Sequence, residues 1–144
     1  MTCASAVSPR IIHIAAALLL NADGQTLLVR KRATTAFMQP GGKIEAHELP
    51  VQALARELEE ELGLVIDPTQ ATFLGQFSAP AANEPGFVVQ AEIFQLTIDA
   101  EVSPAAEIEE VIWVDPAIDP VLELAPLTRD LILPFYRASL TRIA

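Results

Sequence analysis

Cysteine, histidine and basic residues are scarce in this chain of 144 residues. It contains one cysteine, Cys3, two histidines, and nine Lys and Arg residues against 19 Asp and Glu residues. A single cysteine excludes an internal disulfide and fits a reducing compartment, so we predict a cytoplasmic location. No cluster of cysteine and histidine indicates zinc. The formal net charge of −10 opposes unspecific binding to nucleic acid polymers or to membranes, because either partner would require basic patches.

The chain also lacks a hydrophobic run long enough to cross a bilayer. Residues 11–20 are apolar, but this run is too short to span a membrane, and residues 1–9 contain no basic residue of the kind that precedes a signal-peptide core. We therefore predict a buried strand there and a flexible lead-in over residues 1–9. With 51% hydrophobic and 19% charged residues, residues 10–144 are expected to form a single compact domain.

Apolar patterns and turn residues predict an α/β fold. The expected strands cover residues 10–20, 25–32, 36–39, 71–78, 87–98 and 107–114, and the expected helices cover residues 50–62 and 127–140. Asp23-Gly24 is a hairpin signal, so the first two strands are predicted to form a hairpin. Pro134 predicts a kink or an interruption in the second helix.

A glycine loop leads into the first predicted helix. Gly41 and Gly42 precede a run of helix formers, and Pro50 suits the first helical turn, where a missing N–H costs nothing. Gly63 stands where a left-handed C-terminal cap belongs. At about 100° per residue, one apolar stripe of this helix is expected to face the core. The stripe consists of Val51, Ala55, Leu58 and Leu62.

The same helix carries an acidic face made of Glu57, Glu60 and Glu61. Their i, i+3, i+4 spacing places the three carboxylates side by side, where they repel one another unless a cation lies among them. Mg²⁺ prefers oxygen ligands and commonly binds a few carboxylates together with substrate phosphates. Arg56, at the edge of this face, can pair with Glu48 and hold the loop against the helix. The alternative is that these glutamates form only a solvated surface.

The complete spacing from Gly42 to Leu64 favours the metal site over the solvated surface. It reads Gly, five residues, Glu48, seven residues, and then Arg-Glu-aliphatic-any-Glu-Glu-any-Gly-aliphatic. All nine fixed positions match, and the stretch therefore resembles the signature of the Nudix (MutT-type) hydrolases. From average residue usage, a chance match at one starting point has a probability of roughly one in a billion.

The resemblance implies a Nudix-type α/β/α sandwich around a mixed β-sheet. It also implies a metal-dependent pyrophosphohydrolase that cleaves the diphosphate linkage of a nucleoside diphosphate linked to another moiety. The implied substrate is a nucleoside triphosphate or an ADP-ribose-like compound, and the implied cofactor is Mg²⁺ or Mn²⁺. The implied metal ligands are Glu57, Glu60, Glu61 and the carbonyl of Gly42, and the implied supporting pair of the catalytic site is Arg56 and Glu48. The alternative function is a non-catalytic Nudix-fold module that senses a nucleotide, although such a module is expected to have lost residues of the signature.

Four residues outside the core of the signature are candidates for substrate binding. Arg30 and Arg32 belong to a basic cluster at the end of a predicted strand that leads toward the glycine loop, and the alternative for them is a solvated strand end. Gly41 stands in the glycine loop itself. Gln39 replaces the aliphatic residue that many family members carry before Pro-Gly-Gly, and its side chain can face substrate or meet a backbone group. Strand edges and apolar faces also leave a homodimer open.

Overall fold

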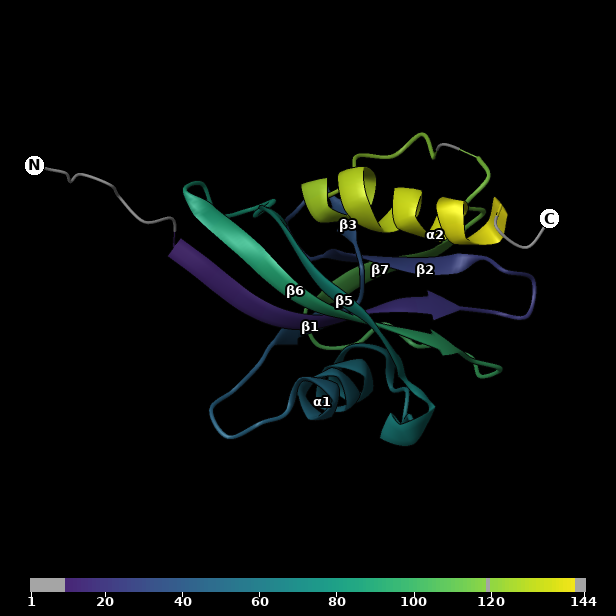
Figure 1. Cartoon of the computed structure of the whole chain (residues 1–144), viewed down its shortest axis with the longest axis horizontal. Helices are drawn as coiled ribbons and strands as arrows, with labels where there is room; N and C mark the ends of the chain where they lie inside the picture. The colour runs from purple at the N-terminus through teal and green to yellow at the C-terminus, as the bar shows by residue number, and fades with distance from the viewer. Residues whose placement is uncertain (1–9, 119, 142–144) are drawn as a thin grey trace, which may run out of the picture.

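A seven-stranded sheet forms the centre of the fold, and a helix covers each of its faces (Figure 1). The computed structural model describes residues 10–118 and 120–141, so the predicted lead-in over residues 1–9 lies outside the described residues. The strands are β1 (Arg10–Leu20), β2 (Thr26–Lys31), β3 (Phe37–Met38), β4 (Gly41–Lys43), β5 (Thr72–Pro80), β6 (Phe87–Thr97) and β7 (Ile108–Val114). The helical elements are α1 (Pro50–Leu62), the 3₁₀ turn η1 (Pro68–Gln70), the π-helical turn η2 (Thr128–Ile132) and α2 (Leu133–Thr141).

The sheet is mixed, as predicted. Its main path runs β3-β2-β1-β6-β5, with β4 paired to β1 and β7 paired to β2. The long central strands β1 and β6 run parallel to each other, and the other strand pairs are antiparallel. Figure 1 shows α1 below this sheet and α2 above it, which confirms the predicted α/β/α sandwich.

Strand β1 explains why the first apolar run of the sequence is continuous. Alternate side chains of this strand enter two different cores, because successive residues of a strand point to opposite faces. Ala15, Ala17 and Leu19 join the core that contains α1, and Ala16, Leu18 and Leu20 join the core that contains η2 and α2. A strand that is covered on both faces needs apolar residues at every position.

The predicted hairpin between the first two strands is confined to its turn. Asn21 shapes this turn, since its side-chain Oδ1 accepts hydrogen bonds from the backbone N–H groups of Asp23 and Gln25, both at 3.0 Å. Beyond the turn, β1 and β2 share the single register pair Leu20 and Thr26. Strand β1 pairs instead with β6 and β4, and β2 pairs with β7 and β3. Pairing with strands that are distant in sequence therefore replaced the local ladder.

The second predicted helix is present, and its predicted interruption lies just before Pro134. The backbone N–H of Leu133 donates to the carbonyl of Thr128, five residues earlier, so η2 is a wide π turn. Pro134 has no N–H to donate to a carbonyl one turn earlier, and it stands in the first turn of α2. Within the described part of the chain, neither helix has the length and apolar character that a membrane crossing requires.

Helix α1 begins and ends where the sequence predicted, and it buries Leu58 and Leu62 of the predicted stripe, but its buried face is rotated relative to that stripe. Gly63 adopts φ +64° as its left-handed cap, and its N–H donates to Glu59. The buried residues are Ala53, Leu54, Leu58, Glu61 and Leu62, whereas Val51 and Ala55 of the predicted stripe are only half-buried. The helix packs on β4 as well as on β1. This double contact rotates one glutamate of the predicted acidic face into the interior.

Candidate functional site

The glycine loop lies against the central strand β1 without room for a side chain. Strand β4 pairs with β1 so that Gly41 is opposite Ala16 and Gly42 is opposite Ala15. Gly41 adopts φ +150°, and a Cβ at this position would lie 2.2 Å from the carbonyl oxygen of Ala15. The Cα of Ala16 would lie 2.6 Å away. Both the Ala15 oxygen and the Ala16 Cα belong to the backbone of the sheet, so neither can move aside easily. Only glycine allows the loop to approach β1 this closely.

Two glutamates of α1 contact this pair of glycines. A Cβ at Gly42 would lie 2.4 Å from the carboxyl carbon of Glu57, so the Glu57 carboxylate rests directly on the Gly42 backbone. The backbone N–H of Gly41 donates to Oε1 of Glu61 at 3.2 Å. The loop and the helix are thus joined through carboxylates, as the predicted metal site requires.

Arg56 connects the exit of the loop to the same carboxylates. Its Nε donates to Oε2 of Glu48 at 2.7 Å and its Nη2 donates to Oε1 of Glu48 at 2.9 Å, which is a two-pronged ion pair. Nη2 also donates to the carbonyl of Lys43, and Nη1 donates to Oε2 of Glu57 at 2.8 Å. The predicted pairing of Arg56 with Glu48 is present.

The hydrogen bonds from Arg56 shift the acidity of Glu48. They are the main reason that the pKa of Glu48 is lowered to about 2, and a hydrogen bond from the backbone N–H of Glu45 adds to this effect. The same contact raises the pKa of Arg56 above its usual value. Both groups are therefore charged at neutral pH.

The three glutamates of the predicted acidic face lie in different environments. Glu61 is buried, with 2% of its surface exposed, whereas the side chain of Glu60 is 50% exposed. Glu57 lies between these extremes and is held by Arg56, whose Nη1 also lies 3.5 Å from Oε1 of Glu60. The expectation of one shared acidic face is thus only partly met, because α1 turns Glu61 toward the sheet.

Burial makes Glu61 a weak acid. The pKa of Glu61 is raised to about 8, mainly because burial disfavours the charged form. The negative charges of Glu57 and Glu107 raise the pKa of Glu61 further. The hydrogen bond from the backbone N–H of Gly41 and the positive charge of Lys31 lower it. Oε2 of Glu61 has no hydrogen-bond partner among the described residues. A cation beside this oxygen would satisfy it and favour the ionised carboxylate.

The donors around Gly42 fit the divalent cation that the family implies, although they are not gathered as a closed cage. In residues 10–118 and 120–141, no group of three or more His, Cys, Asp and Glu side chains is already arranged to hold a metal ion. The partnerless oxygen of Glu61, the Glu57 carboxylate on Gly42 and the half-exposed carboxylate of Glu60 supply oxygen ligands on one side of α1. Mg²⁺ retains waters and takes few protein ligands, so an open set suits it.

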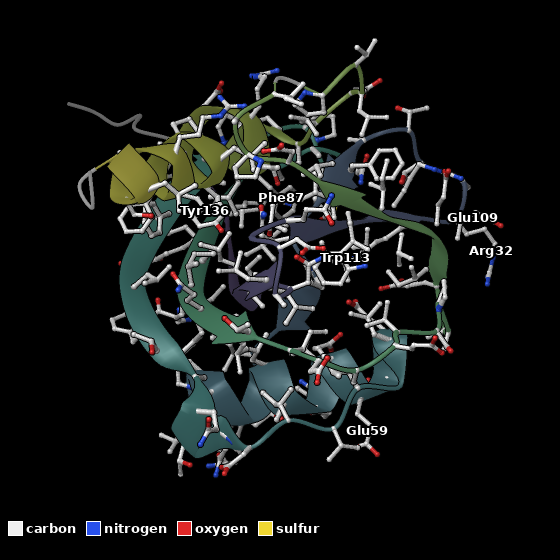
Figure 2. All side chains as sticks on the ribbon, turned by 90° about the vertical axis from the view of Figure 1, so that its right-hand side faces the viewer. Arg32, Glu59, Phe87, Glu109, Trp113 and Tyr136 are labelled. Atoms are coloured by element: carbon white, nitrogen blue, oxygen red, sulfur yellow. The ribbon has the colours of Figure 1, made fainter. Side chains whose placement is uncertain are left out.

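Arg30 and Arg32, the predicted substrate contacts on β2 and just after it, are both held by other groups. Nε of Arg30 donates to Oε1 of Glu110 at 2.9 Å, and its Nη1 donates to the carbonyl of Thr34. Nη2 of Arg32 donates to the carbonyl of Ala106 at 2.8 Å. Figure 2 shows Arg32 at the edge of the molecule, pointing outward. Substrate binding by these two arginines stays a prediction.

Lys31, between these two arginines, is a basic residue beside the glycine loop. It lines a cleft of about 140 Å³ together with Gly41, Gly42 and Gln39, and Lys43 lines the same cleft. Nζ of Lys31 lies 3.3 Å from Oε1 of Glu107. Sequence analysis identified the basic cluster but named only Arg30 and Arg32 as candidates. Strand alternation predicts that Arg30 and Lys31 point to opposite faces of β2, and a β-bulge interrupts the register between them.

A larger hollow exists elsewhere on the molecule. It measures about 570 Å³, is lined by Asn21, Asp99 and Trp113 among others, and contains no glutamate of α1 in its wall. Trp113 also packs against the core beneath α1. The wall of the smaller cleft contains no glutamate of α1 either, but it includes Gly41 and Gly42, which contact Glu61 and Glu57, so this cleft is the candidate active site.

Comparisons with known proteins agree with this geometry. Residues 10–131 match the NUDIX domain family. An 8-oxo-dGTP diphosphatase of Haemophilus influenzae is 47% identical over 60 residues, which cover 39% of this chain and 44% of that protein. An RNA pyrophosphohydrolase of Marinomonas sp. is 42% identical over 59 residues, which cover 41% of this chain and 35% of that protein.

Structural similarity extends over more of the chain. The crystal structure of a MutT protein from Methanosarcina mazei has a TM-score of 0.72 and covers 93% of this chain and 98% of that chain, at 23% identity. This likeness establishes the fold. The chain spans less than half of the length of the two curated relatives above. The family match nevertheless covers most of the chain and confirms the prediction from the signature, so this chain belongs to the NUDIX domain family.

Proposed function

We propose that this protein hydrolyses the diphosphate linkage of a nucleoside diphosphate linked to another moiety, with Mg²⁺ or Mn²⁺ as cofactor. The observation that carries the proposal is the contact of the glycine pair with the α1 carboxylates, where Glu57 rests on Gly42 and Gly41 donates to Glu61. A helix whose acidic residues adjoin an open backbone loop can hold a cation and a pyrophosphate together. Family membership and the names of both curated relatives support the same reaction class.

The residues proposed to hold the cation are Glu57, Glu60, Glu61 and the carbonyl of Gly42. When bound, the cation would neutralise the negative charge of the phosphates and lower the pKa of the attacking water molecule. Arg56 and Glu48 are proposed to position these ligands, since their two-pronged pair fixes the guanidinium that holds Glu57. Positioning of this kind commonly affects metal affinity or activity by about 10–100-fold.

Glu60 is the glutamate best placed to accept a proton from the attacking water. Its side chain is half-exposed, and its ion pair with Arg56 is longer than the one that Glu57 makes. Glu57 is confined between Arg56 and Gly42, and Glu61 is buried against Gly41. Glu60 can therefore reach a nucleophile in the open cleft with the least rearrangement.

The substrate is proposed to be a small nucleotide, either a nucleoside triphosphate or an ADP-ribose-like compound. The acidic surface, with a formal net charge of −10, disfavours long nucleic acid polymers. Because one curated relative is an RNA pyrophosphohydrolase, a short RNA with a 5′-triphosphate belongs among the compounds to be tested. A cytoplasmic location and a homodimer stay predictions.

The test is phosphate release from a panel of nucleotides with Mg²⁺ or Mn²⁺. The panel contains ADP-ribose, dinucleotide polyphosphates, NADH, nucleotide sugars, nucleoside triphosphates and a 5′-triphosphate RNA, with coupled phosphatase and pyrophosphatase to reveal every product. Glu60→Gln is expected to lower turnover by about 10²–10⁴-fold. Glu59→Gln is the matched control, because Glu59 lies next to it on α1 but is exposed and points away from the sheet (Figure 2).

Metal-dependent hydrolysis that Glu60→Gln lacks and Glu59→Gln retains is the expected result. Equal activity in both variants would contradict the assignment of Glu60. Absence of hydrolysis across the whole panel, with nucleotide binding retained, would instead favour the sensing module as the function of this chain.

A further inference from the structure

The cleft beside the glycine pair continues into a second, apolar cavity. The first cavity, of about 140 Å³, includes Gly41 and Gly42 in its wall, and the second, of about 70 Å³, extends to Leu127 and Thr128. Both are lined by Ile14, Met38, Gln39, Ala82 and Val89. The two cavities therefore form one cleft, which leads from the α1 carboxylates to the inner end of η2.

The apolar part of this cleft contains one polar group without a partner. Gln39 is 6% exposed, and its side-chain Nε2 has no hydrogen-bond partner among the described residues. An amide nitrogen that is buried without an acceptor loses its hydrogen bonds to water and gains none in return. Gln39 lines both cavities, so this buried donor lies behind their shared wall, where a small movement of the side chain would bring it to a ligand.

Thr128 is the hydrogen-bond partner of the Gln39 amide. Thr128 is fully buried, and its hydroxyl donates to Oε1 of Gln39 at 2.5 Å, across 89 residues of sequence. With the hydroxyl of Thr128 on the amide oxygen, the two-proton donor Nε2 is the atom of this amide that has no partner among the described residues. The reverse orientation of the amide would leave an acceptor and would favour a ligand amino group. The two orientations therefore predict opposite ligand preferences.

We propose that Nε2 of Gln39 donates a hydrogen bond to a keto oxygen on the base of the substrate, with Thr128 as the positioning residue. The side chains of Ile14, Met38 and Val89 supply apolar contact for a planar ring, and the open end of the cleft leads its phosphates toward Gly42. This inference rests on the proposed function. It assigns the substrate class as nucleotides of guanine, hypoxanthine or uracil, in preference to those of adenine.

The test is a binding measurement that does not depend on turnover. Calorimetric titration of the Glu60→Gln protein with IDP and ADP compares two purines that differ at position 6, where one has a keto oxygen and the other an amino group. IDP is expected to bind at least about 10-fold more tightly than ADP, as the loss of one hydrogen bond to a buried group would produce. Replacement of Gln39 by Met, which keeps the length of the side chain without a polar atom, is expected to remove this preference.

Thr128 provides a second, independent pair of variants. Thr128→Val removes the hydroxyl with little change of shape and is expected to reduce the preference for IDP, because the amide of Gln39 can then turn. Thr128→Ser keeps the hydroxyl and is expected to restore the preference. A residue with only a structural role would change the unfolding temperature of both variants without changing the ratio of the two affinities. Thermal unfolding of each variant establishes that the comparison is made on folded protein.

Three results would overturn the proposal: equal affinity of Glu60→Gln protein for IDP and ADP, tighter binding of ADP, or a preference for IDP that persists in Gln39→Met. The outcome is separable from that of the proposed function. A keto preference without hydrolysis of any nucleotide would contradict the hydrolase and support the role of Gln39. Metal-dependent hydrolysis without base preference would support the hydrolase and contradict the role of Gln39.

Discussion

The carboxylate of Glu57 occupies the space that a side chain on Gly42 would need. A Cβ on Gly42 would lie 2.4 Å from the carboxyl carbon of Glu57, and Arg56 holds that carboxylate in place with a 2.8 Å hydrogen bond. At Gly41, by contrast, the atoms in the way belong to the backbone of β1. These neighbouring glycines are therefore constrained by different parts of the molecule, one by the site and one by the sheet.

The two glycines are expected to respond differently to alanine. Gly42→Ala displaces the end of a flexible side chain, so we expect near-normal stability and a fall in turnover of about 100-fold, the cost of misplacing a ligand by about 1 Å. Gly41→Ala forces β4 away from β1 and adopts a strained φ, so we expect a loss of about 3 kcal/mol or more in the free energy of unfolding. Urea denaturation and steady-state kinetics distinguish the two. Equal stability of both variants would contradict this division.

Arg56→Lys tests the two-pronged ion pair with Glu48. Lysine keeps the charge but cannot donate to both oxygens of Glu48 and to Glu57 at once. We expect turnover to fall by about 10–100-fold and the Mg²⁺ concentration for half-maximal activity to rise. Arg129→Lys is a suitable control, because Arg129 makes an exposed ion pair with its neighbour Asp130 away from the cleft. Unchanged kinetics in Arg56→Lys would show that charge alone is sufficient.

Glu61 predicts a characteristic dependence of stability on pH in the metal-free protein. Folding raises the pKa of Glu61 from 4.5 to about 8, so folding favours the protonated form. Below pH 4.5 the group is protonated in both states and has no effect. As pH rises from about 4.5 to about 8, ionisation is easier in the unfolded chain, and the folded state loses on the order of 5 kcal/mol.

The comparison with Glu61→Gln isolates this effect. The variant cannot ionise, so its free energy of unfolding is expected to exceed that of the wild type progressively as pH rises through this window. Urea denaturation at several pH values measures the difference, and Glu59→Gln, at an exposed position, is expected to give a flat difference curve. A flat curve for Glu61→Gln as well would contradict the raised pKa. In the wild type, Mg²⁺ binding is expected to release a proton and to tighten as pH rises toward 8.

Tyr136 is expected to contribute to stability without affecting the reaction. Its buried hydroxyl donates to the carbonyl of Gly24 at 2.8 Å and fastens α2 to the turn between β1 and β2. Tyr136→Phe leaves that carbonyl without its partner, so we expect a loss of about 1 kcal/mol, or about 2–4 °C in the unfolding temperature. The kcat and KM values are expected to be those of the wild type. Calorimetry measures the loss of stability, and the nucleotide assay measures kcat and KM. A change in KM would contradict the prediction, because it would mean that α2 contacts the substrate.

Local features of the sequence were sufficient for the limits of α1 and of most strands, but not for the short strand β4 or the turn η1. Pro50 and Gly63 delimit α1 because their backbone preferences act on the residues beside them. The pairing of Arg56 with Glu48 was also predictable, since both residues lie within one loop-helix segment. The match of the signature from Gly42 to Leu64 then identified the family before any contact was known.

Other features depended on contacts between distant parts of the chain. No local pattern indicated that β1 would pair along its whole length with β6, and this pairing limits the predicted hairpin to its turn. The burial of Glu61 followed from the packing of α1 on both β1 and β4, which rotated the helix relative to its apolar stripe. Helical periodicity describes one element at a time and contains no information about the orientation of its neighbours.

Gln39 is the clearest case of a residue whose environment depends on a contact between distant segments. Its position before Pro-Gly-Gly marked it as unusual, but the sequence left open whether it faces substrate or meets a backbone group. Its partner proved to be the hydroxyl of Thr128, 89 residues away on η2. The sequence by itself determined the family, the signature residues and the limits of most elements, because these depend on short-range backbone preferences and fixed spacings. Only the tertiary structure decided which polar groups are buried and which atom of Gln39 is free, because burial arises where distant segments close around a common core.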